Sequence, residues 1–159
     1  FGEVELTMEN KPATATTNIP ATAVAVNGMG VLLRGPSGSG KSDLALRLID
    51  RGAQLIADDY VTAGETSGAV MLTPPATIAG MLELRGAGVA KFAYETNVPL
   101  ALVVDLVRSE DVERMPEPEE TTICGAPVPL MRLNGFDASA PIKVEMTLAA
   151  ITGDLEMVQ

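Results

Sequence analysis

A glycine-rich segment near residue 40 has the residue types and the spacing that bind phosphate groups. It fits the pattern G-x-x-x-x-G-K-[ST], and its residues are Gly35, Pro36, Ser37, Gly38, Ser39, Gly40, Lys41 and Ser42. Glycines let successive backbone N–H groups turn inward around phosphate oxygens, and a following helix adds positive potential. Lys41 would reach the β- and γ-phosphates, and Ser42 would offer a hydroxyl ligand to Mg²⁺. The segment therefore predicts a nucleoside triphosphate site.

Two adjacent carboxylates, Asp58 and Asp59, follow the apolar run at residues 55–57 and lie 23 and 24 positions after Gly35. Two like charges side by side cost free energy unless a bound group compensates them. These residues end the strand that follows the P-loop helix. We expect that strand end at the carboxyl edge of the sheet, beside the phosphates. Because neighbouring strand residues point to opposite faces, one Asp can hold Mg²⁺ and the other can act as general base. The alternative is a solvated turn, but the distance from the P-loop favours the functional interpretation.

Short strands and one helix are expected to position these groups. Residues 21–26 and 31–34 are typical of two strands joined by a hairpin turn at residues 27–30. Residues 41–52 follow a helical pattern, with Leu44, Leu48 and Ile49 on one face and Gly52 at the end.

The rest of the chain predicts a single α/β domain. Residues 62–80 indicate a hairpin and loop, residues 100–107 a buried strand, residues 108–120 an acidic loop and residues 143–155 a terminal helix. No internal repeat is visible. We expect a polar, Thr-rich tail at residues 1–19 and one domain at residues 20–159, with a mixed sheet and a β-hairpin before the P-loop.

Composition excludes several classes of function. The 159 residues carry a formal net charge of −10, which argues against binding to nucleic acid or to an anionic membrane. No histidine is present, so His-based zinc sites, Ser-His-Asp triads and phosphohistidine intermediates are excluded, and acid–base work falls to Asp or Glu. A single cysteine, Cys124, cannot form an internal disulfide and is typical of a reducing cytoplasm. No apolar run approaches the ~18 residues of a spanning helix.

Other P-loop classes fit less well. A GTPase should show an N-K-x-D motif, but the one Asn-Lys pair, Asn10-Lys11, precedes the P-loop. Nucleotide and small-molecule kinases usually have an Arg-rich lid, whereas only four arginines follow the P-loop helix: Arg85, Arg108, Arg114 and Arg132.

Residues 30–61 and the segment Leu82-Glu83-Leu84-Arg85-Gly86-Ala87-Gly88 together resemble one family, HPr kinase/phosphorylase. That family carries a P-loop, a paired Asp at this spacing and a signature close to L-E-x-R-G-x-G. The resemblance covers residues 20 to 150, which correspond to the family's C-terminal catalytic domain, and the layout is similar to the short alphaproteobacterial form. It implies a P-loop kinase domain of the HPr kinase/PEP carboxykinase-like type.

The resemblance also implies a reaction and a set of roles. ATP would phosphorylate a seryl hydroxyl of HPr, the small carrier of the sugar phosphotransferase system, or of an HPr-like relative, and inorganic phosphate would drive the reverse reaction. Asp58 would be the general base, Asp59 would act at the metal, and Glu83 would lie near the metal and nucleotide. The remaining implied residues are Arg85, Gly86 and Gly88 at the partner site and Arg114 at the transferring phosphate. A cytoplasmic hexamer is the implied assembly.

One departure from the family pattern lies fifteen positions before Gly35. The family commonly has a histidine there, thought to help activate the Asp, and this chain has Pro20. Two other functions stay open, and the missing histidine bears on the second of them. One is a small-molecule kinase with the same phosphate apparatus, and the other is a regulatory ATP-binding module without turnover.

Overall fold

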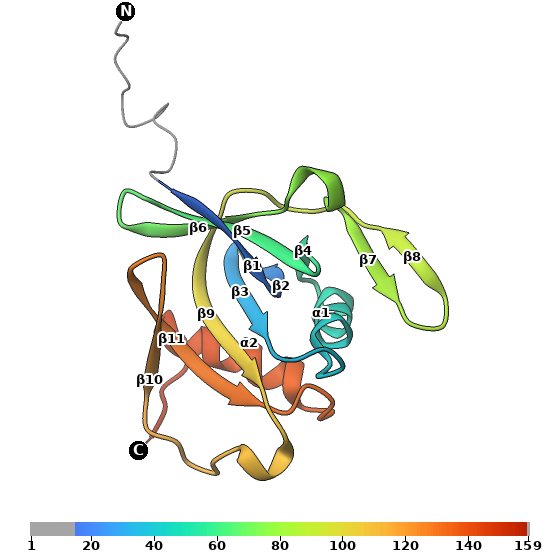
Figure 1. Cartoon of the computed structure of the whole chain (residues 1–159). Helices are drawn as coiled ribbons and strands as arrows, with labels where there is room; N and C mark the ends of the chain where they lie inside the picture. The colour runs from blue at the N-terminus through green and yellow to red at the C-terminus, as the bar shows by residue number, and fades with distance from the viewer. Residues whose placement is uncertain (1–14, 159) are drawn as a thin grey trace, which may run out of the picture.

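The computed structural model describes residues 15–158, and its centre is a mixed sheet with helices on one side (Figure 1). The strand β9 (Val98–Leu106) lies between β3 (Met29–Arg34) and β11 (Ala126–Leu133) and is parallel to both. On the other side of β3, the antiparallel strand β2 (Thr22–Val26) separates it from β4 (Gln54–Ala57). The strands β3, β4, β9 and β11 therefore run in one direction, and their carboxyl ends share one edge.

Three antiparallel strands continue the sheet beyond the start of β9. They are β1 (Thr16–Pro20), β5 (Tyr60–Thr66) and β6 (Ala69–Thr73), and β6 pairs with β9 at Val98 and Pro99. The strand β10 (Glu119–Ile123) pairs with β11. A separate hairpin of β7 (Met81–Leu84) and β8 (Gly88–Lys91) projects from the body of the molecule (Figure 1). Two short 3₁₀ turns, η1 (Ala76–Ile78) and η2 (Ser109–Asp111), lie in the connections.

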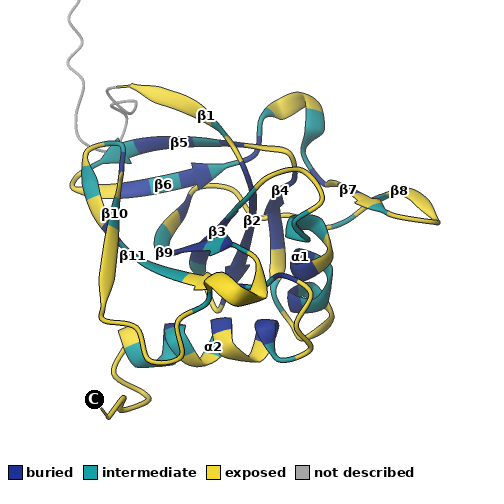
Figure 2. Cartoon of the chain, turned by 60° about the horizontal axis from the view of Figure 1, so that its bottom comes forward, coloured by how far each residue is buried: buried dark blue, intermediate teal, exposed yellow. Residues whose placement is uncertain are grey.

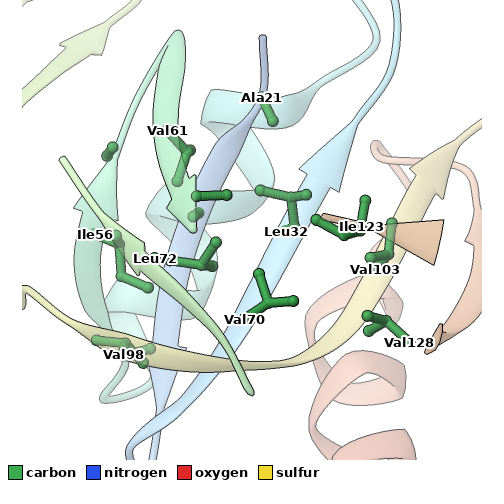
Figure 3. Packing of buried hydrophobic residues seen from close by; sticks show 14 residues of the cluster. Ala21, Leu32, Ile56, Val61, Val70, Leu72, Val98, Val103, Ile123 and Val128 are labelled. Atoms are coloured by element: carbon green, nitrogen blue, oxygen red, sulfur yellow. The ribbon is translucent and has the colours of Figure 1, made fainter. Parts of the chain in front are cut away.

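The central sheet has an apolar layer on each face because successive strand residues alternate between faces. Val31 and Leu33 face the helices α1 (Lys41–Asp50) and α2 (Ala140–Ile151), while Leu32 faces the opposite layer. Figure 3 shows that opposite layer, in which Leu32 and Val103 meet side chains of the neighbouring strands. Burying a leucine side chain fully stabilises a fold by about 1.5–3 kcal/mol, so these two layers hold the shared edge in place.

The helix α2 covers one face of the sheet with only part of its surface. Val144 and Leu148 are buried against the sheet, whereas Met146 is 54% exposed, and Figure 2 shows the corresponding alternation of dark and yellow turns. The helix begins at Ala140, three residues before the predicted start, because Pro141 is compatible with the first turn of a helix. It ends at Ile151, ahead of Gly153 with φ +87°.

The predicted C-terminal limit of the tail, residue 19, is wrong. Thr16–Pro20 form β1, which pairs with β5 from Thr16↔Gly64 to Pro20↔Tyr60. The Thr-rich composition suggested a loose segment, but threonine is a favourable strand residue when a partner strand is present. Pro20 is therefore the last residue of β1. The earlier part of the predicted tail, residues 1–14, lies outside the described residues.

Several other predicted elements are confirmed with shifted limits. The mixed sheet is present, and β9 is its central strand. The hairpin predicted at residues 62–80 begins at Tyr60, and the acidic loop gives way to β10 at Glu119. None of the helices in residues 15–158 combines the length and apolar character needed to cross a membrane.

Candidate functional site

The glycine-rich segment connects the end of β3 to the start of α1. Gly38 and Gly40 have φ angles of +84° and +97°, which favour glycine. Gly35 is closely surrounded, because a Cβ there would lie 2.5 Å from Ser39 Oγ and 3.2 Å from the carbonyl oxygen of Leu106. The preceding Arg34 makes a bidentate ion pair with Asp105 on β9, at 2.8 and 3.1 Å. The loop is therefore compact and begins at a fixed point of the sheet edge.

Two polar groups of this loop are suited to an anion. Lys41 Nζ donates hydrogen bonds to the carbonyl oxygens of Gly35 and Pro36, at 2.7 and 3.1 Å, so its ammonium lies against the loop. Ser39 Oγ is buried and has no hydrogen-bond partner among residues 15–158. An orphaned buried hydroxyl costs about 1–3 kcal/mol and is the kind of atom that a ligand or a water satisfies.

Asp58 lies directly beside the P-loop, as the order of strands requires. Its side chain is only 6% exposed, and Oδ1 accepts hydrogen bonds from Ser42 Oγ and Thr22 Oγ1, each at 2.8 Å. Ser42 is the first-turn residue of α1, Thr22 begins β2 and Asp58 follows β4. Three elements that end or begin at one sheet edge thus meet at a single carboxylate oxygen. These two hydrogen bonds fix the orientation of the buried carboxylate.

Asp59 has a different environment from its neighbour. It adopts φ +70°, and Tyr60 N–H donates to Asp58 O across it at 2.8 Å, which forms a three-residue turn. The carbonyl of Asp59 accepts a hydrogen bond from Ala21 N–H at 3.1 Å. The pKa of the Asp59 carboxyl is raised, first by partial burial, then by the charges of Asp58 and Glu83, while Lys41 opposes the shift. Negative charge is therefore in excess at this point.

The excess charge at Asp59 suits a cation that arrives with a ligand. Within residues 15–158, no group of three acidic or thiol side chains closes around a common point as a ready-made metal site. Mg²⁺ commonly takes one or two protein carboxylates and completes its shell with water and substrate phosphates. The side chains of Ser42, Asp59 and Glu83 carry hydroxyl and carboxylate oxygens, which are the kinds of ligand that such an open site takes.

We expect Asp59→Asn to raise the thermal stability of the ligand-free protein at neutral pH. A carboxyl with a raised pKa in the fold lowers stability once it is ionised, and this penalty fades as the pH falls through the folded pKa. Asparagine also tolerates positive φ. The measurement is the melting temperature, with and without Mg²⁺, at neutral and acid pH.

The matched control for this experiment is Glu117→Gln, which removes one charge from an exposed loop. The stabilisation by Asp59→Asn should shrink at acid pH, whereas the control should show no comparable change. A melting temperature that falls in Asp59→Asn at neutral pH would contradict the interpretation of Asp59 as an uncompensated charge.

The other predicted residues lie farther out. Glu83, on β7, is close enough for its charge to raise the pKa of Asp59. Arg85, Gly86 and Gly88 occupy the exposed turn of the β7–β8 hairpin, where Gly86 and Gly88 have φ angles of +92° and +116°. Arg114 lies in an exposed loop after η2, and within residues 15–158 it makes no hydrogen bond or ion pair with the P-loop. The structure thus brings the P-loop, the Asp pair and Glu83 together, but leaves Arg85 and Arg114 apart.

Sequence reasoning missed the residues that support the P-loop from outside. Thr22 lies in no motif, yet it bonds to Asp58. Gly135 lies against the loop, because a Cβ on it would be 2.5 Å from Ser39 O. Arg47 of α1 bonds to the carbonyl oxygens of Gly135 and Asp137. The only sequence signal for this packing is a glycine between a strand and a helix.

The sheet, the loop and the carboxylates define a mixed α/β domain with a phosphate-loop motif at one sheet edge. The chain belongs to the HPr serine kinase C-terminal domain family, whose model matches residues 12–146. A solved structure of the Hpr(Ser) kinase/phosphatase from Coxiella burnetii superposes with a TM-score of 0.77, over 88% of this chain and 93% of that one. At 24% sequence identity, this likeness shows the shared fold.

Curated relatives resemble part of the chain more closely. The HPr kinase/phosphorylase of Leptothrix cholodnii is 42% identical over 114 residues, which are 64% of this chain and 35% of that protein. The protein of the same name from Bordetella pertussis is 39% identical over 117 residues, or 67% of this chain and 38% of that protein. The chain therefore spans less than two fifths of the length of these relatives.

Proposed function

We propose that this chain is an ATP-dependent protein-serine kinase/phosphorylase that acts on an HPr-like phosphocarrier. The observation that carries the proposal is the hydrogen bond from Ser42 of the P-loop to Asp58, which joins a phosphate-binding loop to a buried carboxylate. Family membership supports the same reaction, because the curated relatives are named HPr kinase/phosphorylase.

We assign the phosphates of ATP to the P-loop and to Lys41. The backbone N–H groups of the loop would bind them, and Lys41 would exchange its carbonyl partners for phosphate oxygens. Ser42, Asp59 and Glu83 would hold Mg²⁺. When bound there, the cation would neutralise the negative charges of Asp59 and of the β- and γ-phosphates.

We assign to Asp58 the role of general base, which accepts the proton of the attacking seryl hydroxyl. Its Oδ1 already accepts two hydrogen bonds, from Thr22 and Ser42, so Oδ2 is the oxygen assigned to the proton. In the forward direction the seryl oxygen forms a bond to the γ-phosphorus, the bond from that phosphorus to the β–γ bridging oxygen breaks, and ADP leaves. In reverse, Asp58 returns the proton to the seryl oxygen while inorganic phosphate takes the phosphoryl group and forms pyrophosphate.

The projecting β7–β8 hairpin is the surface we assign to the carrier. It extends away from the sheet in Figure 1 and bears Arg85, Gly86 and Gly88 at its exposed end. Glu83, on β7 of the same hairpin, is close enough for its charge to raise the pKa of Asp59, so it connects the two regions. Arg114 is assigned to the transferring phosphate, which requires its loop to move toward the P-loop when the substrates bind. A cytoplasmic hexamer remains the proposed assembly.

The test is incubation of the protein with labelled ATP, Mg²⁺ and purified HPr-like proteins. We expect label on a seryl residue of the carrier. Transfer to a small metabolite with no carrier present would instead indicate a small-molecule kinase. Tight ATP binding without any transfer would indicate a regulatory module.

Position 20 supplies a separate prediction about rate. Pro20 ends β1 next to Ala21, whose N–H donates a hydrogen bond to the carbonyl oxygen of Asp59, and this neighbouring bond supports a position near the Asp pair. We expect Pro20→His to raise the initial rate of carrier phosphorylation, because a hydrogen-bond donor there adds electrostatic stabilisation where charge moves. The wild type should show slow transfer.

The control for this substitution is Thr16→His at the other end of β1, where the side chain is also exposed. That variant should transfer phosphate at the wild-type rate. An unchanged rate in a folded Pro20→His protein would show that position 20 takes no part in the chemistry.

A further inference from the structure

An exposed aromatic ring lies directly against the P-loop, and no motif accounts for it. The ring belongs to Phe136, which is 60% exposed although the whole chain has only three phenylalanines and no tryptophan. Its atoms Cε1 and Cζ are 3.2 Å from the position that a Cβ on Gly40 would take. One edge of the ring therefore touches the loop, and most of its surface remains open to solvent.

The backbone on both sides of Phe136 is fixed. Arg47 Nη1 donates to Asp137 O at 2.9 Å, and Nη2 of the same guanidinium donates to Gly135 O. Asn134 Nδ2 donates to Val107 O at 3.1 Å, while Phe136 N–H donates to Asn134 Oδ1 at 3.0 Å. The ring thus belongs to an ordered segment. Binding of a ligand to it therefore costs less conformational entropy of the protein.

The order of strands places Phe136 on the opposite side of the P-loop from the Asp pair. Asp58 and Asp59 follow β4, and the segment with Phe136 follows β11 at the same sheet edge. The order across this edge is β4, β2, β3, β9 and then β11. Transfer requires the γ-phosphate to lie near Asp58, so the nucleoside end of a triphosphate must extend the other way, toward β9 and β11.

We propose that the exposed face of Phe136 stacks on the nucleobase of the bound nucleoside triphosphate. This inference rests on the proposed function for the phosphates, and it adds a binding residue for the base. Every nucleobase has a π-face, so an aromatic ring beside the phosphate loop suits this end of the ligand. Removing such a stacking partner lowers affinity by about tenfold, within a wide range.

The test compares two ligands, Mg²⁺–ATP and inorganic tripolyphosphate, by titration calorimetry on the full chain. Phe136→Ala should bind ATP about tenfold more weakly or worse, while tripolyphosphate, which has no base, should bind as it does to the wild type. Met146→Ala removes another exposed apolar side chain, on α2, and should change neither affinity. Lys41→Ala should weaken both ligands.

The variant Phe136→Trp supplies a direct readout, because it would carry the only tryptophan in the chain. It should keep wild-type ATP affinity, and its fluorescence should change with ATP but not with tripolyphosphate. Equal losses of both ligands in Phe136→Ala, or an unchanged ATP affinity, would overturn the stacking role. A wild type that binds neither ligand would contradict the phosphate site itself and the stacking role with it.

Discussion

We expect the Lys41→Ala protein to lose productive ATP binding and all phosphoryl transfer. The ammonium of Lys41 lies against the loop, where the carbonyl oxygens of Gly35 and Pro36 accept its hydrogen bonds. A hydrogen bond to a charged group contributes about 1.5–3 kcal/mol, so two bonds to phosphate oxygens predict a loss of about a hundredfold or more in affinity. The measurement is the dissociation constant of Mg²⁺–ATP, with carrier phosphorylation followed in parallel.

The control for this loss is Lys143→Ala, which removes an exposed lysine from α2. It has the same change in net charge and should bind ATP normally. Near wild-type affinity and transfer in Lys41→Ala would mean that the glycine-rich loop is not the phosphate site.

We expect Asp58→Asn to keep ATP binding and to lose most of the transfer rate. Asparagine retains an Oδ1 that can accept the hydrogen bonds of Ser42 and Thr22, so the fold and the loop should persist. It cannot accept the seryl proton, and general base catalysis contributes roughly 10²–10⁴ in rate. The measurement is the single-turnover rate of carrier phosphorylation at saturating ATP.

Asp59→Asn is the informative partner of this variant. We expect it to weaken the dependence on Mg²⁺ concentration, because Asp59 is assigned to the metal and lies in the zone of excess negative charge. A normal rate in Asp58→Asn together with a dead Asp59→Asn would show that the two roles are reversed.

The elements that the sequence predicted well are those with local signals. The buried strand at residues 100–107 became β9 with small shifts, because its apolar run is long and continuous. The helix after the P-loop was predicted at residues 41–52 and spans Lys41–Asp50, with Leu44 and Leu48 buried as expected. Local apolar patterns and a glycine at the end of the helix sufficed for these elements.

Elements that depend on distant partners were predicted poorly. β1 was assigned to a tail because its exposed residues show strand character only when paired with β5. Thr22 and Asp58 are 36 positions apart, and the bond from Arg47 to Asp137 spans 90 positions. No local pattern encodes such contacts, so the support of the P-loop by residues 134–137 became visible only in the fold.

The most direct test of the proposed reaction is intact-mass analysis of an HPr-like carrier after incubation with this protein, ATP and Mg²⁺. We predict that the carrier gains one phosphoryl group on a seryl residue, that Lys41→Ala and Asp58→Asn leave the carrier unmodified on the same time scale, and that added inorganic phosphate releases pyrophosphate from the modified carrier. A carrier that stays unmodified while the wild type binds ATP tightly would contradict the proposed kinase function.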